Sequence, residues 1–144
     1  MAAETPKPNP ALKRLERLVG TWIIEGRTLG SKDNNASGRV SIDWLPGGFF
    51  LQQRGEIEVR GSKVYGLEIV GYDPATDIFP SYVFSNVGEA SGRYYWNVQG
   101  DVVTYWTEGR NILADSVGTE MFYQAVGDRA REWRALREIR IMRQ

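Results

Sequence analysis

The chain has 144 residues, which suits one domain with a sizeable core, and its formal net charge is zero. Nucleic-acid-binding domains are usually strongly basic, so this balance argues against a nucleic acid as a partner. Histidine and cysteine are both absent, which excludes Ser-His-Asp and Cys-His catalysis, disulfides and histidine-ligated haem, and we expect neither a metal nor a cofactor. No run approaches the roughly 18 apolar residues of a membrane span, and the start has no signal-peptide pattern, so we expect a soluble, cytoplasmic protein without a membrane partner.

The first part of the chain predicts a flexible arm followed by one short helix. Residues 1–10 contain three prolines and few apolar groups, so they are assigned to the arm, and residues 11–144 to the folded domain. Asn9-Pro10 is a favourable helix start, because proline at the first turn gives up an N–H that has no partner there. Leu12, Leu15 and Leu18 follow at helical spacing, and Gly20 ends the helix.

After the helix, short apolar and aromatic runs alternate with turn residues about every 10 positions. Such a texture is typical of an all-β sandwich or barrel. With 16 glycines and 12% aromatic residues, the chain is rich both in turns and in large rings that can fill or line an interior. The expected strands are 21–29, 38–45, 49–59, 63–72, 78–85, 93–99, 102–108, 117–125 and 132–142.

Gly100-Asp101 predicts a two-residue type II′ hairpin loop, since glycine stands in the first position. The loop pairs Trp96 with Tyr105 and Tyr95 with Trp106. The face that carries the first pair is expected to point inward, and the outward Tyr95–Trp106 pair is either a cross-strand contact or a homodimer contact. The inward face comprises Tyr94, Trp96, Val98, Val103, Tyr105 and Thr107.

A second hairpin is predicted with a four-residue connection at 45–48, which pairs Trp44 with Phe49. Its inward face is apolar except for Gln53. A buried amide without a partner costs on the order of 1–3 kcal/mol, so Gln53 is either a satisfied structural group or a polar anchor for a ligand. The face comprises Val40, Ile42, Trp44, Phe49, Leu51, Gln53, Ile57 and Val59.

Two features remain ambiguous in the sequence. Glu68 lies in a strand with two largely apolar faces; inward it would be a candidate acid or base, but we favour an ordinary outward carboxylate. Residues 129–144 have a helix-like composition, yet Trp133, Ala135 and Ile139 share a face only on a strand. We therefore expect this segment to be the closing strand.

Gly20-Thr21-Trp22 after a short helix resembles the lipocalin G-x-W signature. That resemblance implies that the Trp closes the barrel base and that a late Arg, here Arg137 or Arg140, packs across its indole. The wider pattern resembles a bacterial family, domain of unknown function 1579, over about residues 11–108. It rests on three segments: the stretch from Leu12 to Trp22, Trp44-Leu45-Pro46-Gly47-Gly48-Phe49-Phe50-Leu51, and Glu68-Ile69-Val70-Gly71-Tyr72-Asp73-Pro74.

The family resemblance implies a lipocalin-like, calycin-type antiparallel β-barrel of about eight to ten strands, with one N-terminal helix. It also implies a ligand pocket, and it implies no reaction. We expect a small hydrophobic molecule to bind inside the barrel; the alternatives are a metal-free isomerase or cyclase of a polyketide-like substrate, with Glu68 as its candidate acid or base, and a solidly packed barrel that self-associates. The expected ligand-binding residues are Trp44, Gln53, Tyr94, Trp96 and Tyr105.

Overall fold

The computed structural model describes residues 4–28, 31–87, 92–109, 119–128 and 130–141, and it confirms an all-β barrel with one N-terminal helix. Nine strands form the closed wall, and each predicted strand is found within about two residues of its expected ends. They are β1 (Gly20–Thr28), β2 (Ala36–Trp44), β3 (Leu51–Val59), β4 (Ser62–Val70), β5 (Phe79–Ser85), β6 (Gly92–Gln99), β7 (Val102–Gly109), β8 (Thr119–Ala125) and β9 (Glu132–Ile141).

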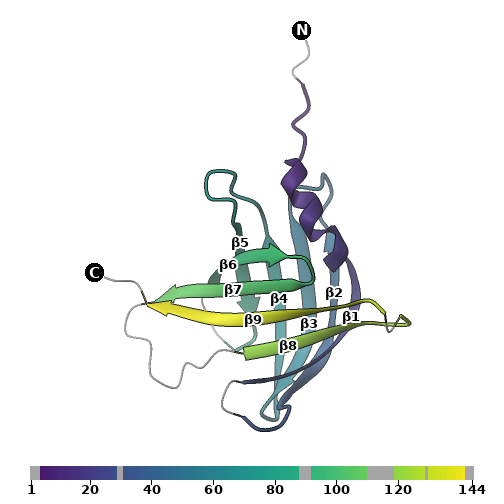
Figure 1. The fold of residues 1–144 in the computed structure, drawn as a ribbon, viewed down its shortest axis with the longest axis vertical. Helices are drawn as coiled ribbons and strands as arrows, with labels where there is room; N and C mark the ends of the chain where they lie inside the picture. Colours follow the sequence, from purple (N-terminus) through teal and green to yellow (C-terminus); the bar gives the residue numbers. More distant parts are fainter. Residues whose placement is uncertain (1–3, 29–30, 88–91, 110–118, 129, 142–144) are drawn as a thin grey trace.

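The strands follow chain order around the wall until β7, and then β9 lies between β7 and β8 (Figure 1). β8 pairs with β1 and closes the barrel, while β9 pairs with β8 antiparallel and with β7 parallel. The barrel is therefore mixed rather than wholly antiparallel. The tail from Glu132 is a strand, as expected, and it closes the wall because it pairs on both edges.

The helix η1 (Pro10–Leu18) lies across one end of the barrel (Figure 1) and has 3-10 geometry. A 3-10 helix has about three residues per turn, so the spacing of Leu12, Leu15 and Leu18 places all three side chains on one stripe. Each of them is buried. Asn9 caps the helix by accepting a hydrogen bond from the Ala11 N–H at 2.9 Å. The helix thus closes one end of the barrel with leucine side chains.

Trp22 lies beneath this helix, as the G-x-W resemblance implied. Its indole N–H donates to the Leu18 carbonyl at 2.8 Å, and its side chain is 1% exposed. The guanidinium that covers the indole belongs to Arg131, 5.3 Å from the ring centroid. The turn before β9 brings Arg131, a residue that the resemblance did not indicate, back to Trp22. The side chains of Arg137 and Arg140 lie outside the described residues.

The Gly100-Asp101 hairpin has the predicted register, with Trp96 opposite Tyr105 and Tyr95 opposite Trp106. Gly100 takes a φ of 62°, which the first central position of a type II′ turn requires. The outward Tyr95 and Trp106 rings stack at 5.9 Å, and Trp106 is only 8% exposed. The expectation of an exposed pair is therefore wrong for Trp106, which is buried.

The register predicted for the other hairpin is wrong by two residues. Trp44 pairs with Leu51 rather than with Phe49, because the connection runs over residues 45–50. Gly47 and Gly48 both adopt positive φ, at 98° and 77°, so the chain makes a wider turn than four residues allow. A shift of two keeps every strand residue on its predicted face, but Phe49 leaves the strand and is 37% exposed.

Among the residues that the structure describes, no helix is long and apolar enough to cross a membrane.

Candidate functional site

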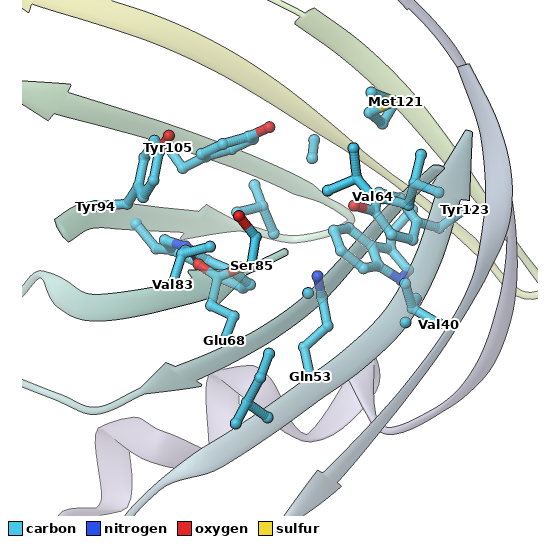
Figure 2. Close-up of a pocket in the computed structure, with 18 residues that line it drawn as sticks. Val40, Gln53, Val64, Glu68, Val83, Ser85, Tyr94, Tyr105, Met121 and Tyr123 are labelled. Carbon is cyan, nitrogen blue, oxygen red and sulfur yellow. Dashed lines mark hydrogen bonds between the residues drawn. The ribbon is translucent and has the colours of Figure 1, made fainter. Parts of the chain in front are cut away.

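The interior of the barrel contains a cavity of about 250 Å³. Most of its wall consists of aliphatic and aromatic side chains that the alternation of the strands turns inward. Figure 2 shows side chains from several strands converging on this space. The lining residues are Val40, Gln53, Gly55, Ile57, Val64, Gly66, Leu67, Glu68, Val83, Ser85, Tyr94, Trp96, Val103, Tyr105, Met121, Tyr123, Trp133 and Ala135.

Glu68 points into this cavity (Figure 2), so the preferred interpretation of an outward surface carboxylate is wrong. Its Oε2 accepts hydrogen bonds from the Ser81 hydroxyl at 2.7 Å and from the Trp96 indole N–H at 2.9 Å. Burial raises the pKa of Glu68 to about 7, although both hydrogen bonds act to lower it. The carboxyl is thus held in one orientation and is poised between its neutral and charged forms near neutral pH.

Gln53 lies beside Glu68 on the neighbouring strand, because the two residues are paired between β3 and β4. Its Oε1 is buried and has no hydrogen-bond partner. The indole Nε1 of Trp133, another cavity residue, is also buried without a partner. An unpaired buried polar atom costs on the order of 1–3 kcal/mol. The cavity therefore holds one acceptor and one donor that a guest molecule or water can satisfy.

Aromatic rings form much of the remaining wall. Tyr94 and Tyr105 meet at 5.8 Å, edge to face, and Tyr105 lies 6.4 Å from Trp96. Tyr123 stacks on Trp133 with ring centroids 3.6 Å apart. Burial raises the pKa of Tyr123 well above its usual value, with smaller contributions from Tyr105 and Glu68. Its phenol therefore stays neutral at physiological pH and can donate a hydrogen bond.

Four of the five predicted ligand-binding residues lie together in this cavity: Gln53, Tyr94, Trp96 and Tyr105. Trp44 is the exception. It lies at the helix end of the barrel, where its indole N–H donates to Glu16 Oε2 at 2.7 Å. Its face was predicted correctly, but alternation along a strand does not tell which end of the barrel holds the cavity.

Tyr123 and Trp133 also line the cavity and were not among the ligand-binding residues expected from the sequence. Both belong to the last two strands, beyond the part of the chain in which the family resemblance was seen. The available signal was the apolar face that Trp133 shares with Ala135 and Ile139 when the segment is a strand. The cavity also contradicts the alternative of a solidly packed barrel.

Within the described ranges, no group of three or more Asp and Glu side chains is arranged to hold a metal ion. In a comparison with protein families, the model described as "Protein of unknown function (DUF1579)" matches residues 7–136. This match extends beyond residue 108 and includes β8 and the first half of β9, which supply Tyr123 and Trp133. No curated protein matches the chain.

Proposed function

Because the chain belongs to the DUF1579 family, whose description assigns no activity, we propose its function from the cavity: the barrel binds a small hydrophobic molecule. The observation that carries this proposal is a concave space of about 250 Å³ inside the barrel, with mainly apolar walls and a few polar atoms. Natural ligand sites combine these same features, an apolar concave wall and a small number of placed polar groups.

The volume limits the size of the guest. An apolar cavity of about 150 Å³ in another protein admits benzene. In proportion, a cavity of about 250 Å³ has room for a guest of about ten non-hydrogen atoms. A guest with one substituted ring or a short branched chain fits this volume, and a complete long-chain fatty acid does not.

Binding of fluorobenzene and 4-fluorotoluene, followed by ¹⁹F NMR of the ligand and by the melting temperature of the protein, tests the proposal. Both probes lie within the size limit and carry no group that needs a specific partner. We expect saturable binding and a rise in melting temperature. The matched control is Gly66→Val, which places an aliphatic side chain in the cavity, reduces its volume and should weaken both effects. Failure of the wild-type protein to bind either probe would refute the proposal.

The inward position of Glu68 favours a second candidate, a metal-free isomerase or cyclase of a hydrophobic, polyketide-like substrate. A carboxyl with a pKa of about 7 can take a proton from the carbon next to a carbonyl and return it at another carbon. Acetophenone in D₂O is a suitable model, since exchange of its methyl protons for deuterium reports the first half of that transfer. We expect exchange with the wild-type protein and none above background with Glu68→Gln; equal rates would eliminate this candidate.

A further inference from the structure

Resting on the proposed binding function, we propose that the barrel selects small organic amines: the protonated nitrogen is held between Glu68 and Gln53, and the apolar body lies among the aromatic side chains.

The first support is the arrangement of acceptors. Glu68 Oε2 is occupied by Ser81 and Trp96, and no hydrogen bond to its other oxygen is found among the described residues. Gln53 Oε1 is buried and unpaired on the neighbouring strand. Directly paired residues on one face of a sheet have Cβ atoms about 4.5–5.5 Å apart, so both oxygens lie within reach of one guest group. An ammonium group offers up to three N–H donors and no acceptor, which matches this pair of oxygens.

The second support is charge. Among the lining residues that the structure describes, Glu68 is the one with a formal charge, and none is Lys or Arg. A carboxylate guest would place a second negative charge in a largely apolar space, where an uncompensated charge is costly. An ammonium guest supplies a positive charge, which the described lining residues do not offer Glu68. The cavity thus discriminates between head groups that are equal in size and different in charge.

The third support is the aromatic wall. Tyr94, Tyr105 and Tyr123 line the cavity together with Trp96 and Trp133. The π face of an aromatic ring attracts a cation by roughly 0.5–2 kcal/mol, and several rings around an ammonium group form a known kind of recognition site. The same rings provide an apolar surface for the rest of the guest. Neither property favours an anionic ligand.

The pH response follows from the groups that face Glu68. These are Ser81 from β5, Trp96 from β6, Gln53 from β3, and the three cavity tyrosines from β6, β7 and β8. Glu68 is the one described lining residue with a carboxyl group, and we expect it to change charge between pH 5 and 8. With its pKa at about 7, the carboxylate fraction falls by up to about a hundredfold from pH 8 to pH 5, and amine affinity should fall with it.

Three ligands that share one ring and differ in the head group test the inference: 4-fluorophenethylamine, 2-(4-fluorophenyl)ethanol and 4-fluorophenylacetate. Dissociation constants come from ligand ¹⁹F NMR at pH 8. We expect the amine to bind at least about tenfold more tightly than the alcohol, because hydrogen bonds to charged groups contribute about 1.5–3 kcal/mol. The acetate should bind most weakly of the three. Lowering the pH to 5 should weaken the amine and leave the alcohol unchanged.

Glu68→Gln keeps the shape of the side chain and an acceptor for Ser81 and Trp96, so we expect it to remove the preference for the amine and to retain alcohol binding. The matched control is Glu56→Gln, an outward carboxylate on β3 that lies 3.5 Å from the Lys63 ammonium; it should leave all three affinities unchanged. The pH series on the wild-type protein provides a test that does not depend on the folding of any variant.

The possible results separate the two proposals. Alcohol binding as tight as amine binding, an acetate that binds most tightly, or an amine preference that survives Glu68→Gln or the change to pH 5 would overturn the amine inference and leave the binding function standing. If none of the three ligands binds, and the neutral fluoroarenes do not bind either, both proposals fail together.

Discussion

Gly55 and Gly66 are directly paired between β3 and β4, and both line the cavity, yet we expect opposite results when each is changed to alanine. A Cβ at Gly66 would have its nearest neighbour, the Phe84 carbonyl oxygen, 3.9 Å away. A Cβ at Gly55 would lie 2.7 Å from the Arg39 carbonyl oxygen and would also collide with a Val40 methyl group. The two substitutions therefore differ only in the space that receives the methyl group.

Two contributions determine how much a substitution at Gly66 changes the free energy of unfolding. Glycine inside a strand costs roughly 0.5–1 kcal/mol relative to alanine, and each carbon that is newly buried contributes up to about 0.8 kcal/mol. We expect Gly66→Ala to raise the free energy of unfolding by about 1 kcal/mol and Gly66→Val by about 1–3 kcal/mol. At Gly55 the added carbon forces backbone or side-chain shifts, and overpacking of this kind costs about 1–3 kcal/mol.

Urea unfolding of the three variants and the wild-type protein at one pH measures these differences. For a domain of 144 residues, 1 kcal/mol corresponds to about 2–4 °C, so thermal melting should give the same order. The reasoning is refuted if Gly66→Ala and Gly66→Val are both destabilised as strongly as Gly55→Ala, because the space beside Gly66 would then be filled.

Three further changes test other parts of the structure. Glu68 has a folded pKa of about 7 against 4.5 for the free side chain, so the wild-type protein should lose stability as the pH rises through this interval. Glu68→Gln has no such titration. Its free energy of unfolding should therefore exceed that of the wild type by up to about 3 kcal/mol at pH 8 and by little at pH 4.5. If urea unfolding gives the same difference at both pH values, this prediction is contradicted. Arg131→Ala should lower the free energy of unfolding by roughly 0.5–2 kcal/mol, because it uncovers the Trp22 indole. The control Arg134→Ala changes an exposed residue and should lower it by less than about 0.5 kcal/mol. Equal losses would argue against the stacking of Arg131 on Trp22. Leu15→Ala removes a fully buried side chain from η1 and should cost about 2–5 kcal/mol; a loss below 1 kcal/mol would show that the helix does not close the barrel.

Local patterns in the sequence predicted the strands well, because alternation and turn residues act over a few positions. The Gly100-Asp101 loop fixed the register of its hairpin, since a two-residue loop leaves one pairing. The length of the loop at residues 45–50, and with it the register of its hairpin, could not be determined in the same way, because Gly47 and Gly48 permit several turn lengths. The parallel pairing of β7 with β9 joins segments far apart in the chain, and no local pattern reports such a contact.

The orientation of Glu68 was missed for a specific reason. Leu67 and Ile69 make the outer face of β4 apolar as well, so alternation alone could not choose a side. The signal lay in the preceding turn: Arg60 and Gly61 both take positive φ, at 52° and 82°, which is typical of a two-residue type I′ loop. Counting from that loop places Glu68 opposite Gln53 and therefore on the inward face.

Xenon tests the central claim most directly, because it enters apolar cavities that are empty and has no polar preference of its own. A crystal of the wild-type protein kept under xenon pressure should show a strong anomalous peak inside the barrel, bounded by Gly66, Val83 and Met121, and a crystal of Gly66→Val should show a weaker peak or none. A wild-type barrel that takes up no xenon and is occupied at this position by its own side chains would contradict the account.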